Sequence, residues 1–157
     1  MIFKILTLFP EIFPGPLSHS ITGRALVEKK FEIEAINIRE FSKNKSKTVD
    51  DKPYGGGPGM IFKPDILQRS LNFAKKKARK KTKIIMLSAN GKKFDQKFAK
   101  ETIKNDELII ICGRYEGVDQ RFIDSNSIEE ISIGDYVLSG GEIPALILID
   151  TCVRLIP

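Results

Sequence analysis

Cysteine and histidine are scarce in this chain of 157 residues, which has two cysteines and one histidine. Cys112 and Cys152 each lie in an apolar run, with no further cysteine or histidine at the spacing of a metal site. We therefore predict two buried, reduced thiols and no metal site. His19 alone cannot supply a metal site or a His–Cys dyad, so we expect it on the surface or at a helix cap.

Long hydrophobic runs are also missing. The apolar amino-terminal segment is interrupted by Lys4, Pro10, Glu11 and Pro14, which is unlike the continuous core of a signal peptide. The longest aliphatic stretches fall far short of the roughly 20 residues that span a membrane. We therefore predict a cytoplasmic chain without a membrane partner.

Several motifs of common enzyme classes are absent. No G-x-G-x-x-G follows an expected strand, and no G-x-x-x-x-G-K-[ST] occurs, which excludes the dinucleotide fingerprint and the P-loop. The sequence also lacks H-E-x-x-H and G-x-S-x-G, which excludes the usual zinc hydrolases and serine esterases.

The composition is that of one globular domain. Hydrophobic residues make up 41% of the chain and charged residues 29%, and the length suits a single core that needs no disulfide. Lysine and arginine number 26 against 20 acidic residues, and the formal net charge of +6 is compatible with a polyanionic partner.

Short apolar segments alternate with amphipathic ones along the chain. The pattern predicts strands at 2–9, 31–38, 83–88, 107–112 and 128–133, and helices at 17–30, 64–80, 94–104, 118–124 and 142–156. This alternation predicts an α/β fold with a mostly parallel sheet flanked by helices. The basic run at 75–83 is expected to be a solvated helix end, with a phosphate-binding patch as the alternative.

Two glycine-rich segments are candidates for binding. The first is in the long loop 42–63, where four of the five residues 55–59 are glycine. The second, 112–119, directly follows the most apolar strand, where α/β sheets bind ligands. A tight turn is the structural alternative for the first segment and an ordinary helix cap for the second.

A third segment, 132–142, combines glycines with apolar side chains. Its backbone amides and carbonyls can read the edge of a heterocycle, while Ile133, Val137 and Leu138 can cover its faces. This combination suits an adenine pocket. From the residues alone, we infer a nucleotide-type ligand in an α/β domain.

Taken together, these segments resemble the bacterial tRNA (guanine-37-N1)-methyltransferases, which belong to the trefoil-knotted SPOUT superfamily. The matching stretches cover essentially the whole chain: they are 8–11, 22–25, 48–51, 53–60, 87–88, 112–117, 132–142 and 148–157. The resemblance implies a deep trefoil knot at about residues 84–144, and a homodimer with each active site at the subunit interface.

The resemblance also implies a site for S-adenosylmethionine, with magnesium as a further candidate cofactor. The expected cofactor-binding residues are Leu87, Ser88, Gly113, Tyr115, Glu116, Ile133, Gly134, Asp135, Tyr136, Val137, Leu138, Gly140, Gly141 and Pro144. The expected residues toward the tRNA and its guanine are Asp50, Tyr54, Gly55 and Gly59, and Arg154 is the expected catalytic residue.

The implied reaction is methyl transfer from S-adenosylmethionine to N1 of guanosine 37 in tRNA. The family's general base is an aspartate beyond the position of Pro157, and its tRNA-binding domain follows. Residues 1–157 are thus expected to form the cofactor-binding half, with weak or no activity alone. The alternatives are a non-catalytic RNA-binding module and a knotted methyltransferase with another RNA target. Ala89 stands where the family usually has proline, and we expect this difference to alter the stiffness of the loop and not its chemistry.

Overall fold

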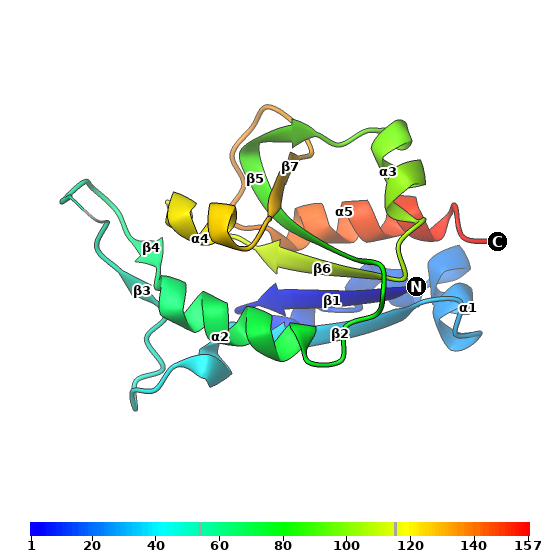
Figure 1. Cartoon of the computed structure of the whole chain (residues 1–157). Coiled ribbons are helices and arrows are strands. Elements are labelled where there is room, and N and C mark those ends of the chain that lie inside the picture. Colours follow the sequence, from blue (N-terminus) through cyan, green and yellow to red (C-terminus); the bar gives the residue numbers. More distant parts are fainter. Residues whose placement is uncertain (54, 115) are drawn as a thin grey trace.

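The computed structural model describes residues 1–53, 55–114 and 116–157, and its centre is a five-stranded parallel sheet in the order β2-β1-β6-β5-β7 (Figure 1). The strands are β1 (Ile2–Thr7), β2 (Glu32–Asn37), β5 (Thr82–Lys93), β6 (Glu107–Cys112) and β7 (Glu129–Ser132). The predicted α/β fold with a parallel sheet is confirmed.

The inner strands β1 and β6 are apolar on both faces because helices cover both sides of the sheet. Phe3 and Ile5 of β1 join one buried cluster, while Leu6 joins the other. In β6 the same alternation sends Leu108 and Ile110 to the first cluster and the residue between them to the second. Such continuous apolar strands are typical of a buried parallel sheet.

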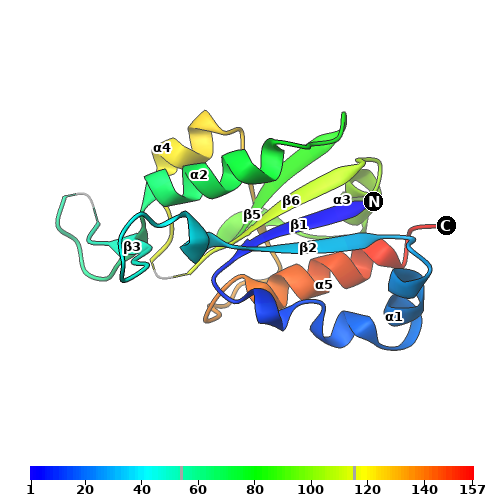
Figure 2. The ribbon, with the colours of Figure 1, turned by 90° about the horizontal axis from the view of Figure 1, so that it is seen from below.

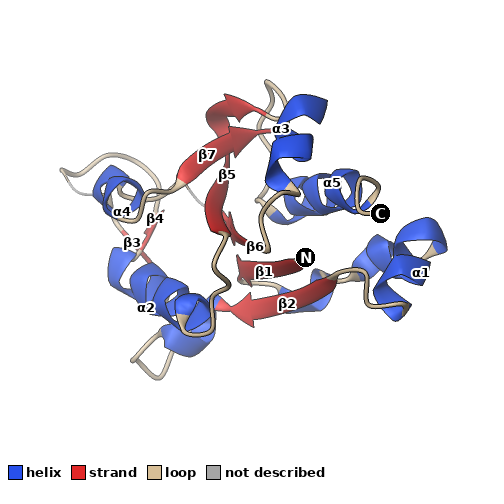
Figure 3. Ribbon diagram, turned by 45° about the vertical axis from the view of Figure 1, so that its right-hand side comes forward, coloured by secondary structure: helices blue, strands red, loops and turns tan. Residues whose placement is uncertain are grey.

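The helices divide between the two faces, as Figures 2 and 3 show. Helices α2 (Pro64–Lys75) and α4 (Gln120–Ser125) pack on one side, and α1 (Ser20–Val27) and α5 (Glu142–Val153) on the other, with α3 (Gln96–Thr102) beside α5. Short 3-10 helices η1 (Pro10–Ile12), η2 (Gly15–Ser18) and η3 (Ile38–Phe41) complete the connections. All five predicted helices are present, but each is shorter than expected.

The predictions for the two cysteines and for the single histidine can be compared with their burial. Cys112 and Cys152 are free and buried, as predicted. Burial raises the pKa of the Cys112 thiol well above its ordinary value and that of Cys152 to about 12. His19 is exposed at the N-cap of α1, where its carbonyl accepts a hydrogen bond from Thr22 Oγ1 at 3.0 Å.

Three differences from the predicted elements concern strand β5, the loop 42–63 and the basic run 75–83. Strand β5 continues to Lys93 instead of ending at Ser88, because its last residues pair with β7. The loop 42–63 contains the antiparallel ribbon β3 (Asp50–Asp51) and β4 (Ile61–Phe62). Helix α2 ends at Lys75, so most of the basic run lies in the following turn.

None of the described helices is long and apolar enough to cross a membrane.

Candidate functional site

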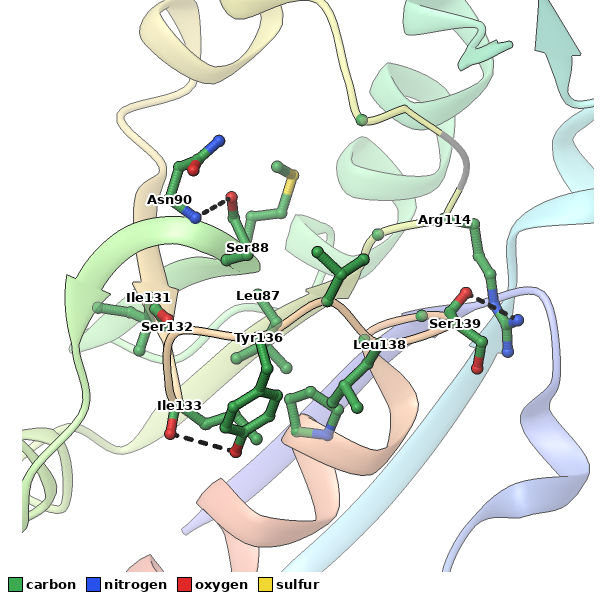
Figure 4. Close-up of a pocket in the computed structure, with 18 of the residues that line it drawn as sticks. Leu87, Ser88, Asn90, Arg114, Ile131, Ser132, Ile133, Tyr136, Leu138 and Ser139 are labelled. Atoms are coloured by element: carbon green, nitrogen blue, oxygen red, sulfur yellow. Dashed lines mark hydrogen bonds between the residues drawn. The ribbon is translucent and has the colours of Figure 1, made fainter. Parts of the chain in front are cut away.

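A pocket of about 230 Å³ lies at the carboxyl edge of the sheet, beside the ends of β6 and β7 and an irregular stretch of β5 (Figure 4). Three segments meet there: 86–90 of β5, 131–141 from the end of β7 onward, and, after β6, the residues Gly113, Arg114, Glu116 and Gly117; Pro144 of α5 completes the lining. These segments are far apart in the sequence. They meet because β5 lies between β6 and β7 in the sheet.

The β5 wall of the pocket is an irregular stretch within the strand. Leu87 pairs with Ile131 of β7, and after a register shift Lys92 pairs with Ile131 as well. The intervening residues 88–91 therefore leave the regular ladder, and Ser88 and Asn90 line the pocket. A Cβ on Gly91 would come within 2.5 Å of the β7 backbone at Ile131, so this bend needs glycine.

The turn after β6 packs directly on the start of α5. The Gly141 amide donates a hydrogen bond to the Gly113 carbonyl at 3.0 Å. A Cβ on Gly141 would lie 2.8 Å from Cys112 Cα and 2.9 Å from the Gly113 nitrogen. The two segments can approach this closely only because Gly141 has no side chain.

The segment after β7 is held by short-range hydrogen bonds. Ser132 Oγ accepts from the Gly134 amide at 3.2 Å and donates to the Gly134 carbonyl at 3.0 Å. The Tyr136 hydroxyl donates to the Ile133 carbonyl at 3.4 Å. Val137, at the tip, is 90% exposed. These hydrogen bonds fix the conformation of this wall, yet it presents apolar side chains to solvent.

A partly buried ion pair joins two of the pocket walls. Arg114 Nη2 donates to Glu142 Oε2 at 3.1 Å, and Arg114 Nη1 donates to the Ser139 carbonyl at 3.1 Å. Glu142 is 2% exposed, and its other oxygen accepts from Thr7 Oγ1 at 2.8 Å. The guanidinium also lies over the Phe9 ring, 4.5 Å from its centroid.

The ribbon β3–β4 is tied to the same turn after β6. The Glu116 amide donates to the Met60 carbonyl at 2.9 Å, and the Phe62 amide donates to the Gly117 carbonyl at 3.2 Å. Gly59 has a φ of +85°, and a Cβ there would overlap the Glu116 side chain. The glycine-rich loop at 55–59 therefore projects from the edge of the sheet that carries the pocket (Figure 1).

The geometry is that of a ligand pocket built mainly from backbone and apolar side chains at strand ends, and comparisons with known proteins indicate its family. A sequence model described as tRNA (Guanine-1)-methyltransferase TrmD matches residues 1–157. The chain belongs to the tRNA (guanine-1)-methyltransferase family. The resemblance drawn from the glycine-rich motifs is thereby confirmed.

Relatives of this methyltransferase family are similar over almost the whole chain. A tRNA (guanine-N(1)-)-methyltransferase from Ehrlichia canis is 50% identical over 98% of this chain, and one from Alkaliphilus oremlandii is 50% identical over all of it. One from Anaplasma phagocytophilum is 46% identical over the whole chain. The chain spans 65% of the length of the first two relatives and 67% of the third.

The predicted cofactor residues of the methyltransferase family converge on the pocket. Those that line it are Leu87, Ser88, Gly113, Glu116, Ile133, Gly134, Tyr136, Val137, Leu138, Gly140, Gly141 and Pro144. Asp135 is exposed and does not line the pocket, and Tyr115 lies outside the described residues. Their role in binding the cofactor stays a prediction.

The predicted substrate and catalytic residues lie elsewhere. Asp50 belongs to β3, and Gly55 and Gly59 to the loop that follows it, while Tyr54 lies outside the described residues. Arg154 is exposed at the far end of α5. At 1.5 Å per residue it is about 15 Å along the helix from Pro144, so it does not reach the pocket of its own chain.

Sequence reasoning missed part of the site. The predicted site gives Glu142 no role of its own, although an acidic residue at the start of a predicted helix, next to two glycines, is a visible signal. Four lining residues lie outside the predicted binding segments and the predicted cofactor residues: Met86, Ala89, Asn90 and Ile131. Four others lie within the predicted segments 112–119 and 132–142 but were not among the predicted cofactor residues: Arg114, Gly117, Ser132 and Ser139.

The donor set for magnesium is not found in the part of the chain that the structure describes. No group of three His, Cys, Asp or Glu side chains there is placed to hold a metal ion. We therefore derive no step through a metal.

Proposed function

We propose that this chain binds S-adenosylmethionine at the carboxyl edge of its sheet and contributes to methylation of N1 of guanosine 37 in tRNA. The observation that carries the proposal is the pocket itself, which combines glycine-rich backbone after β6 and β7 with the apolar side chains of Ile133, Val137 and Leu138. Membership of the tRNA (guanine-1)-methyltransferase family supports the choice of ligand and reaction.

The pocket suits an adenosyl group for two reasons. The amides and carbonyls of the 132–141 segment can satisfy the polar edge of adenine, and the apolar side chains there can cover its faces. Gly113 and Gly141 let the two walls close on each other without side chains between them. Glu116, on the wall nearest the glycine-rich loop, is placed for a polar group of the ligand.

The bound cofactor supplies a methyl group on a positively charged sulfur, which departs in a direct displacement. The chain must hold the guanine in line with this methyl group, and such positioning can contribute about 7–11 kcal/mol to lowering the barrier. N1 of guanine carries a proton at neutral pH, so a general base is required. We expect this base outside the 157 residues, as the family resemblance implies.

The position of Arg154 leads us to propose a homodimer. Its guanidinium could stabilise the negative charge that develops on guanine O6, but Arg154 is about 15 Å along the helix axis from Pro144, at the other end of α5 from the pocket. A second copy could bring Arg154 to the pocket. Exposed apolar side chains support such an interface: Ile143 and Ile147 on α5 are 57% and 43% exposed, close in sequence to the exposed pocket tip.

The remaining parts of the proposal concern the tRNA. The loop at 55–59 would meet the anticodon region, because its neighbours Met60 and Phe62 are bonded to the pocket turn. The excess of basic residues supports contact with phosphates.

Three further expectations do not concern the tRNA. We expect this activity in the cytoplasm, and the trefoil knot of the fold stays a prediction. Magnesium is not assigned a site.

Calorimetry with S-adenosylhomocysteine tests the cofactor site. We expect one ligand per chain, with a bound adenosyl group that protects residues 113–141 from hydrogen exchange. No binding heat, together with salt-sensitive binding of tRNA, would instead favour a non-catalytic RNA-binding module.

Methyl transfer is measured separately with labelled S-adenosylmethionine. The paired substrates are a tRNA with guanosine at position 37 and the same tRNA with adenosine there. We expect any label to require guanosine 37 and to appear slowly, because the general base is expected outside these residues. Label on a ribose 2′-hydroxyl would point to a different RNA target.

Sedimentation velocity tests the dimer. Replacing Ile147 by glutamate should convert dimers to monomers, because the charge would have to be buried at the proposed interface. The control is Phe73→Glu, which places the same charge at an exposed apolar position on α2, on the opposite face of the sheet. A dimer that survives Ile147→Glu would contradict an interface on α5.

A further inference from the structure

A charged side chain outside the predicted cofactor set connects the walls of the pocket. Arg114 lies in the turn after β6, and its two terminal nitrogens bond to different segments: Nη1 to the Ser139 carbonyl and Nη2 to Glu142, both at 3.1 Å. Ser139 belongs to the segment after β7, and Glu142 is the first residue of α5. One planar guanidinium therefore spans three segments.

The carboxylate partner of Arg114, Glu142, is fixed by a hydrogen bond from strand β1. Glu142 is 2% exposed, and its second oxygen is held by the hydroxyl of Thr7, which is fully buried. That hydroxyl in turn accepts the Phe9 amide at 3.0 Å. The network therefore anchors the pocket segments to β1, a central strand of the sheet.

The conformation of Gly140 is matched to this arrangement. A Cβ there would overlap Arg114 Nε and lie 2.7 Å from both Arg114 Cζ and Glu142 Oε2. The resemblance assigned Gly140 to the cofactor. The geometry gives it a second requirement, which is space for the guanidinium.

We propose that Arg114, through its ion pair with Glu142, is a positioning residue that holds the 137–141 segment in the shape that binds the cofactor. This inference rests on the proposed function. The segment is otherwise exposed at its tip, and Arg114 supplies a charge-assisted bond to its backbone. Lysine cannot replace it, because an ammonium lacks the rigid fork that reaches two acceptors in different segments.

The test compares Arg114→Lys with the wild-type chain by calorimetry and by hydrogen exchange. We expect S-adenosylhomocysteine to bind about tenfold more weakly, as for loss of a bond to a charged group. In the absence of ligand, amides 137–141 should exchange faster, while those of β1 and β6 stay protected. The control is Arg79→Lys at the exposed turn before β5, which should change neither measurement.

Two further variants keep the proposal open to refutation if Arg114→Lys folds poorly. Glu142→Gln retains the size of the side chain and its contact with Thr7, and should accelerate exchange of the same amides. Gly140→Ala should do so by displacing the guanidinium; only exchange is measured for it, because Gly140 lines the pocket.

The outcomes separate this inference from the proposed function. Folded Arg114→Lys with both exchange and affinity within twofold of wild type would overturn the inference. Unchanged exchange with weaker binding would also overturn it, because Arg114 would then act on the ligand directly. If the wild-type chain does not bind the ligand, the proposed function fails, while the exchange measurement still decides whether Arg114 orders the segment.

Discussion

Two ion pairs, each with a buried carboxylate, stand at opposite ends of the same sheet. Toward the amino ends of the strands, Lys4 Nζ lies 3.2 Å from Glu107 Oε2, and at the carboxyl edge Arg114 lies 3.1 Å from Glu142. Both carboxylates are almost completely buried. The two pairs connect different parts of the molecule. We therefore expect one to affect the stability of the fold and the other the geometry of the pocket.

The Lys4–Glu107 pair connects regular secondary structure. Lys4 in β1 and Glu107 in β6 belong to neighbouring strands, and Lys4 Nζ donates a hydrogen bond of 2.8 Å to the Ala74 carbonyl in α2. Glu107 Oε2 makes no hydrogen bond among the described residues, so its contact with Lys4 is one of charge alone. The Arg114–Glu142 pair instead bonds to loop backbone at Ser139. We therefore expect the first pair to affect folding and the second to affect binding.

Breaking the Lys4–Glu107 pair should have the largest effect on stability. Lys4→Ala leaves Glu107 buried without its cation, which should lower the free energy of unfolding by about 3–5 kcal/mol. Urea denaturation measures the change. Affinity for S-adenosylhomocysteine should stay within twofold in the folded fraction, and a large loss of affinity would refute the separation of roles.

The matched control for this change is an exposed pair. Glu101 on α3 and Lys104 in the turn after it are exposed and 2.9 Å apart, and Lys104→Ala should leave the urea midpoint unchanged within error. If both variants unfold alike, burial does not distinguish these ion pairs.

A methyl group at the carboxyl edge should have the next largest effect. In Gly141→Ala the new Cβ would meet the backbone of Cys112 and Gly113, and overpacking of this kind costs about 1–3 kcal/mol. It should also separate the two pocket walls and weaken ligand binding. Gly57→Ala is the comparison, because a Cβ there meets nothing within 4 Å and the position does not have a positive φ. Equal stability and ligand binding in the two variants would contradict the packing argument.

The two buried cysteines should have a smaller effect on stability, one that depends on pH. Their pKa values are raised by burial, so the folded chain retains thiol protons that the unfolded chain releases. Stability should therefore be unaffected below about pH 8 and should fall as the pH rises from about 9 toward 12. Denaturation of Cys152→Ala against pH measures this, since the variant should lose less stability over that interval. An identical pH dependence would show that Cys152 does not contribute.

Much of the fold could be predicted because its signals are local. The apolar run at 107–112 became β6 with the predicted bounds, and the apolar spacing in 64–75 became α2. Helix α2 stops at Lys75 and not at residue 80, because the basic side chains of 75–81 repel one another when helical. The glycine-rich motifs identified the family without any structure.

What the sequence determined by itself was therefore the class of fold, the buried strands and the segments able to approach a ligand with bare backbone. The tertiary structure decided which of those segments meet, because strand order depends on pairing between distant residues. It extended β5 through polar residues that only β7 could hold, placed Arg154 away from the pocket, and joined Arg114 to Glu142. Periodicity records how one segment is buried, whereas an ion pair between segments depends on contacts that no local pattern contains.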